Sequence, residues 1–118
     1  MLEKFWAWTD NDGHPEDALS RDELLDNVMF YWLNNTAASS GRLYWESFDL
    51  AAPAPNVAVP AGISQFKKEI FGASRRWAEG VYTDIRYWNQ LNRGGHFAAF
   101  EEPDLFVDEV RASFRHAR

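Results

Sequence analysis

Cysteine is absent from the 118 residues of this sequence. Its absence excludes disulfide bonds, zinc–thiolate sites and a cysteine nucleophile. Long apolar runs are absent as well: none approaches the ~20 residues that a helix needs to cross a bilayer. The first residues also lack the basic and apolar regions of a signal peptide. We therefore expect a cytoplasmic protein with no membrane-spanning segment.

Positive charge is scarce. The 12 Lys and Arg residues are outnumbered by 18 Asp and Glu residues, which leaves a formal net charge of −6. Binding to nucleic acid or to an anionic membrane surface usually requires a basic patch, so we expect neither partner. No Gly-rich phosphate loop occurs either, and we expect no cofactor.

Metal ligands are poorly placed. The loop Asp10–Pro15 (DNDGHP) is rich in turn-forming residues and is similar to a calcium-binding loop. Trp8 stands where the first calcium ligand should be, however, and Leu19 stands where the last carboxylate should be. The sequence therefore predicts no metal site.

Helices dominate the first half of the expected structure. Residues 1–8 resemble the end of a helix whose beginning is missing. Ser20 and Glu23 form a capping box that opens a helix running to about Leu33, and its broad apolar arc predicts packing on two sides. A second helix is expected over Ala38–Phe48.

The pattern changes after the proline-containing linker Ala51–Pro55. Alternating β-branched and small residues predict a strand over Val57–Ile63. A helix over Ser74–Gly80 and a second strand over Asp84–Asn89 are expected to follow it. Pro103 is placed to begin a final helix. Strands alternating with helices are typical of a parallel sheet with crossover helices. Because two strands cannot form such a sheet alone, the rest of the sheet must come from elsewhere.

His96 is the candidate catalytic base. It follows Gly94 and Gly95 directly after the second expected strand, and sites in open α/β sheets gather at the carboxyl ends of strands. A catalytic His needs a partner that fixes its tautomer. Position favours Glu69 over Glu79 and Asp84, because Glu69 also follows a strand. A solvated role for Glu69 beside two lysines stays open, and no Gly-x-Ser-x-Gly nucleophile motif occurs.

Four segments resemble, in the same order, segments of the microsomal type of epoxide hydrolase. They are Leu24–Trp32 for a lid helix, Ser39–Ser47 for the segment with a lid tyrosine, Val59–Gly62 followed by Phe66–Glu69 for the strand and loop of the acid, and Arg93–Pro103 for the catalytic histidine. The resemblance implies the C-terminal portion of an α/β-hydrolase fold, an α/β class with a parallel sheet and crossover helices. Residues 1–50 would be the C-terminal part of the helical lid, 51–56 a linker, and 57–118 the C-terminal strands and helices of the core.

The resemblance also implies roles for three residues. His96 would be the general base that activates water, Glu69 its charge-relay acid, and Tyr44 one of two lid tyrosines that hydrogen-bond the epoxide oxygen. Lys67 replaces a proline of the family, which would loosen the loop before Glu69. The family's oxyanion segment, its nucleophilic Asp and its second lid tyrosine lie earlier in such chains and have no counterpart here.

The implied activity is hydrolysis of an epoxide to a diol through an ester with the enzyme. We expect the chain alone to be inactive, with a small-molecule epoxide as substrate and with an N-terminal half or a second copy of the chain as partner. Two alternatives stay open. One is a non-catalytic remnant or interaction module of the same fold, and the other is a different α/β-hydrolase such as an esterase, against which the motif around Tyr44 argues.

Overall fold

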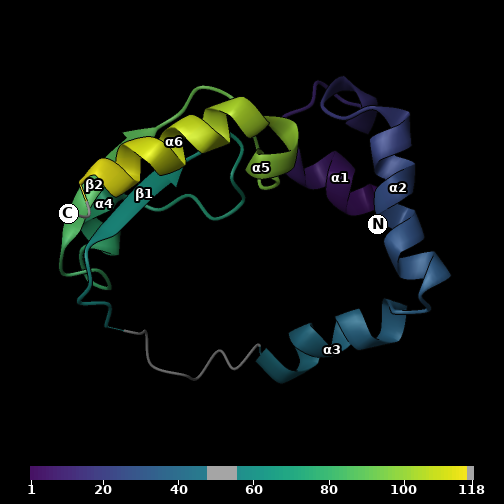
Figure 1. Cartoon of the computed structure of the whole chain (residues 1–118), viewed down its shortest axis with the longest axis horizontal. Coiled ribbons are helices and arrows are strands. Elements are labelled where there is room, and N and C mark those ends of the chain that lie inside the picture. Colours follow the sequence, from purple (N-terminus) through teal and green to yellow (C-terminus); the bar gives the residue numbers. More distant parts are fainter. Residues whose placement is uncertain (48–55, 117–118) are drawn as a thin grey trace.

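A computed structural model describes residues 1–47 and 56–116 of the chain. In Figure 1 the two strands, α4 and α6 lie together at the left of the view, whereas α1 and α2 lie at the right and α3 below them. The described elements are α1 (Leu2–Trp8), the 3-10 helix η1 (Pro15–Asp17), α2 (Arg21–Leu33), α3 (Ala37–Ser47), β1 (Ala61–Gln65), α4 (Arg75–Ala78), β2 (Ile85–Gln90), α5 (Ala98–Glu101) and α6 (Pro103–Arg115).

The capping box predicted for helix α2 is confirmed. The Ser20 hydroxyl accepts a hydrogen bond from the Glu23 amide at 3.3 Å, and the Glu23 carboxylate accepts one from the Ser20 amide at 2.8 Å. Two of the amides left over at the start of the helix are thereby satisfied. The helix ends at Leu33, as predicted, and Asn35 takes a positive φ of 51° in the turn that follows.

The packing predicted for α2 on two sides is wrong for the described part of the chain. Leu24 is the buried residue of this helix, whereas Trp32 is 77% exposed. The reason is that no described element covers the rest of its apolar arc (Figure 1). Helix α3 begins one residue before the predicted start, and Phe48 and the linker Ala51–Pro55 lie outside the described residues. None of the helices described here has the length and apolar character that crossing a membrane requires.

Strands β1 and β2 are parallel neighbours, which confirms the predicted topology. Strand β2 lies within one residue of its predicted bounds. Strand β1 begins at Ala61 instead of Val57, and Val57 makes only an isolated parallel bridge with Tyr82. The physical reason is Pro60, which has no amide hydrogen to donate to the ladder.

Helix α6 packs against this sheet through one close contact and one buried carboxylate. A Cβ added to Gly62 of β1 would lie 1.8 Å from the Ser113 hydroxyl, so the helix and the strand meet without room for a side chain. One turn earlier in the helix, the buried Glu109 accepts hydrogen bonds from three residues of the sheet: Ser64 at 2.7 Å, Tyr87 at 3.0 Å and Asn89 at 2.8 Å. Burial, and then the Glu109 carboxylate, raise the pKa of the Tyr87 phenol.

A small apolar cluster joins the N-terminal helices to the segment that follows β2. Phe5 of α1, Leu19 and Leu24 are buried together, and Ala18 and Phe97 pack against them. The Phe5 and Phe97 rings lie 5.4 Å apart. Because Phe97 directly follows His96, this cluster connects α1 to the chain segment that carries the candidate base.

Candidate active site

The two candidate loops leave the same edge of the sheet. Strand β1 leads into the loop with Glu69, and β2 leads into the loop with His96. Parallel strands end on the same side, which is where sites form in open α/β sheets. The loops stay in contact beyond the strands, because the Lys68 amide donates a hydrogen bond to the Gly94 carbonyl at 3.0 Å.

The structure brings His96 and Glu69 into direct contact. The His96 Nδ1 atom lies 2.7 Å from the Glu69 Oε1 atom, and both side chains are about one-third exposed or less, at 32% and 26%. The predicted proximity is therefore confirmed. The two alternative partners are engaged elsewhere: Glu79 pairs with Arg75 and Asp84 with Arg86.

This geometry suits proton transfer at the other ring nitrogen. A carboxylate beside Nδ1 favours the tautomer with a proton on Nδ1 and leaves Nε2 as the acceptor. The carboxylate also stabilises the imidazolium that forms when Nε2 takes a proton. The pair can therefore act as a base toward a water molecule close to Nε2.

Aromatic rings surround the imidazole and connect it to a cavity. The His96 ring packs edge-on against Trp8 at 5.2 Å and against Phe97 at 5.4 Å. Both of these rings line a cavity of about 440 Å³ that Tyr44 of α3 and Tyr31 of α2 also line. His96 itself is not among the described residues that line this cavity. Tyr44 lies in helix α3, within the helix predicted over Ala38–Phe48.

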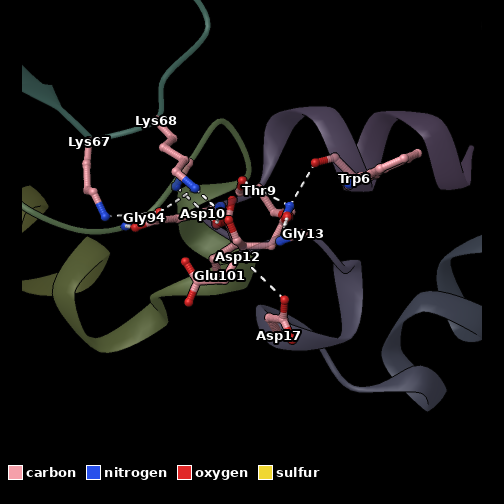
Figure 2. A network of polar contacts seen from close by, with 12 residues as sticks. Trp6, Thr9, Asp10, Asp12, Gly13, Asp17, Lys67, Lys68, Gly94 and Glu101 are labelled. Carbon is pink, nitrogen blue, oxygen red and sulfur yellow. Dashed lines mark hydrogen bonds and ion pairs between the residues drawn. The ribbon is translucent and has the colours of Figure 1, made fainter.

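Two carboxylates that the sequence did not single out hold the loop with His96 (Figure 2). Glu101 accepts hydrogen bonds from the amides of Gly95 at 3.0 Å and Phe97 at 3.1 Å, and also from the amide of Asp10 at 2.7 Å. The Asp10 carboxylate accepts one from the Gly94 amide at 3.1 Å. The contacts of Glu101 with Gly95 and Phe97 are local. Asp10, in contrast, is 84 residues from Gly94, so no sequence spacing pointed to it.

Asp10 also contacts the loop with Glu69. Its Oδ1 atom lies 3.4 Å from the amino groups of both Lys67 and Lys68. Burial alone would raise the pKa of Asp10, but the hydrogen bonds from Lys67 and Lys68 outweigh it and hold that pKa below its ordinary value. Lys67, which stands in place of the family's proline, thus forms an ion pair with Asp10.

The described residues contain no group of three or more His, Cys, Asp or Glu side chains that could hold a metal ion. Two amides of the loop Asp10–Pro15 bind nearby side chains, whereas the Asp10 side chain of this loop contacts Gly94 and the two lysines. The Gly13 amide donates to the Asn11 side chain at 3.0 Å, and the His14 amide donates to the Asp17 carboxylate at 3.0 Å.

Comparison with solved structures defines the class of the fold. The juvenile hormone epoxide hydrolase of the silkworm Bombyx mori matches 97% of this chain with a TM-score of 0.86 and 33% sequence identity. An epoxide hydrolase mutant from Aspergillus niger matches 98% of it with a TM-score of 0.79 and 25% identity. The chain covers 31% and 29% of these two proteins. Its fold is the C-terminal portion of an α/β-hydrolase.

Sequence relatives identify the family within that class. No protein-family model matches the chain. A bacterial protein of Stigmatella aurantiaca, named as a candidate epoxide hydrolase, is 53% identical over the whole chain, and epoxide hydrolase 1 of Sus scrofa is 37% identical over 94% of it. The chain spans 27% of the length of each. It is thus homologous, over nearly its whole length, to part of the epoxide hydrolases, as its resemblance to them predicted.

Proposed function

We propose that this chain supplies the ester-hydrolysing residues of an epoxide hydrolase. In this proposal His96 is the general base, Glu69 orients and stabilises its imidazole, and Tyr44 donates a hydrogen bond to the epoxide oxygen. The 2.7 Å contact between His96 and Glu69 is the observation that carries the proposal. Homology to epoxide hydrolases supports it, and the residue roles come from the resemblance of the surrounding motifs.

The proposed reaction has two covalent steps. A carboxylate from a part of the enzyme outside this sequence attacks an epoxide carbon, the C–O bond breaks, and Tyr44 protonates the oxygen; a tyrosine, with its pKa of ~10, carries that proton at neutral pH. In the second step a water molecule gives its proton to Nε2 of His96 and attacks the ester carbonyl. The ester bond breaks, His96 passes its proton to the departing diol oxygen, and the proton of the released carboxylic acid returns to the Tyr44 phenolate, so that the carboxylate, His96 and Tyr44 are all restored. Dividing one difficult reaction into two easier ones is the advantage of covalent catalysis.

The arrangement of the chain follows from the same proposal. Residues 1–50 would belong to the helical lid, 51–56 to a linker and 57–118 to the α/β core. The exposed apolar side chains of α2 and α3 and the open two-stranded sheet would be covered by an N-terminal half of the enzyme or by a second copy of the chain. Trp8, Phe97 and Phe100 line the cavity, so the substrate class we favour is an epoxide with an apolar substituent.

Diol formation from styrene oxide tests the proposal. The chain alone is expected to give none, because base catalysis without a nucleophile contributes only ~10²–10⁴-fold. Mixed with the N-terminal part of an epoxide hydrolase that carries the nucleophilic Asp, it is expected to give turnover that His96→Gln abolishes. Turnover that survives His96→Gln would show that His96 is not the base. Turnover by the chain alone would show that a nucleophile has been overlooked.

Single-turnover kinetics separate the roles of Tyr44 and His96 in the same mixture. Tyr44→Phe is expected to slow ester formation by about 10²–10³-fold, the usual effect of losing one group that stabilises the developing oxyanion. His96→Gln is expected to leave ester formation intact and to make the ester accumulate. Tyr82→Phe, which alters a tyrosine in a different cavity, is the matched control. Equal loss in Tyr44→Phe and Tyr82→Phe would argue against a role for Tyr44.

A further inference from the structure

Four successive backbone amides in the loop with His96 have acceptors that lie outside that loop. The Gly94 amide donates to Asp10 and the His96 amide to the Trp8 carbonyl at 2.8 Å, whereas the amides of Gly95 and Phe97 donate to Glu101. Two of these acceptors come from the segment that directly follows or ends α1, at the opposite end of the chain. The backbone around the imidazole is therefore held partly by the nearby Glu101 and partly by two residues remote in sequence.

Asp10 differs from the other acceptors because it reaches both loops of the site. Its Oδ2 atom accepts from the Gly94 amide, two residues before His96, and its Oδ1 atom faces the amino groups of Lys67 and Lys68, directly before Glu69. Figure 2 shows these groups converging on the Asp10 side chain. That side chain is only 14% exposed, so the contacts are partly shielded from water.

We infer that Asp10 is a positioning residue that links the loop of His96 to the loop of Glu69 and keeps their side chains in contact. The inference rests on the proposed function. A carboxylate suits this task because its two oxygens accept in different directions and because hydrogen bonds to a charged group are stronger than neutral ones. Glu101 assists by accepting the Asp10 amide, which fixes the carboxylate over the two loops.

Asp10→Asn tests the link with little change in shape. The amide oxygen can still accept from Gly94, but the negative charge that attracts the two lysines is lost. Asp12→Asn is the matched control: it lies in the same segment, and its exposed side chain makes no hydrogen bond or ion pair to residues of the described ranges. Both variants remove one negative charge, so a difference between them reports position and not net charge.

The first measurement uses the chain by itself. In ¹⁵N-histidine-labelled protein, the Nδ1 proton of His96 is assigned by its loss in His96→Gln, and its exchange with solvent is compared. Asp10→Asn is expected to speed this exchange by about tenfold, in line with the loss of a charge-assisted hydrogen bond, whereas Asp12→Asn leaves it unchanged. Exchange as slow in Asp10→Asn as in the unchanged chain overturns the inference.

The second measurement uses the chain mixed with the N-terminal part that supplies the nucleophile. Asp10→Asn is expected to slow ester hydrolysis by about 10- to 100-fold, the scale of a misplaced catalytic group, and to leave ester formation within about twofold. Equal slowing of both steps would mean a purely structural role and overturns the inference. Hydrolysis that His96→Gln abolishes but Asp10→Asn leaves intact overturns it as well. Hydrolysis that survives His96→Gln instead refutes the proposed function, and the proton-exchange result then still decides whether Asp10 positions His96.

Discussion

Replacing Gly95 by alanine should disrupt the loop with His96. A Cβ at this position would lie 2.5 Å from the carbonyl oxygen of Trp8, 2.9 Å from the amide nitrogen of Asp10 and 2.9 Å from a carboxylate oxygen of Glu101. Two of these atoms belong to the backbone and cannot rotate away. Gly95 is thus required for the space it leaves, whereas the neighbouring Gly94 also has a positive φ of 84°.

The loss in the free energy of unfolding can be estimated from the contacts that the added methyl group would displace. Inserting a methyl group into a tightly packed site costs about 1–3 kcal/mol. Moving the loop away also weakens the hydrogen bond from the His96 amide to Trp8 and the one from the Asp10 amide to Glu101, at about 0.5–1.5 kcal/mol each. We expect Gly95→Ala to lower the free energy of unfolding by about 2–6 kcal/mol in all.

Urea unfolding followed by tryptophan fluorescence measures this change, with linear extrapolation to water. Gly41→Ala is the matched control, because a Cβ on Gly41 of helix α3 meets nothing within 4 Å. That substitution should raise stability by about 0.5–1 kcal/mol, since alanine is favoured over glycine inside a helix. A loss below about 0.5 kcal/mol in Gly95→Ala, within the usual range of neutral surface substitutions, would refute the packing described for this loop.

Two further predictions concern carboxylates. Glu109→Ala should lower the free energy of unfolding by about 2–4 kcal/mol, because it leaves Ser64, Tyr87 and Asn89 without their partner. Chemical denaturation measures this change. A change below about 1 kcal/mol would contradict the prediction. The pKa of Asp10 is lowered in the folded chain from its ordinary value of 3.8, so its contribution to stability is fully present above that value and is lost as the pH falls through the folded-state pKa. The stability difference between the unchanged chain and Asp10→Asn should therefore shrink as the pH falls from about 4 through the folded-state pKa of Asp10, and a difference that grows toward acid would reverse the argument.

Local sequence signals were sufficient for the elements whose causes are local. The capping box of Ser20 and Glu23 determines where α2 begins, because both hydrogen bonds lie within four residues. Alternating strand and helix patterns predicted two parallel strands, and parallel strands bring the loops that follow them to one edge. That reasoning brought Glu69 and His96 together, although they are 27 residues apart. The pairing needed no knowledge of side-chain packing.

Only the tertiary structure revealed the contacts between segments that no spacing rule connects. Asp10 meets Gly94 from 84 residues away, and Glu109 is buried under the sheet although a carboxylate on a helix is ordinarily expected at the surface. Strand β1 starts at Ala61 and not at Val57, because a strand needs amides with partners across the sheet and Pro60 has no amide hydrogen. Sequence by itself determined the elements and the pair of chemical groups, since these depend on local hydrogen bonds and on chain direction. Folding decided how that pair is held, because hydrogen bonds between remote segments depend on where the chain returns in space.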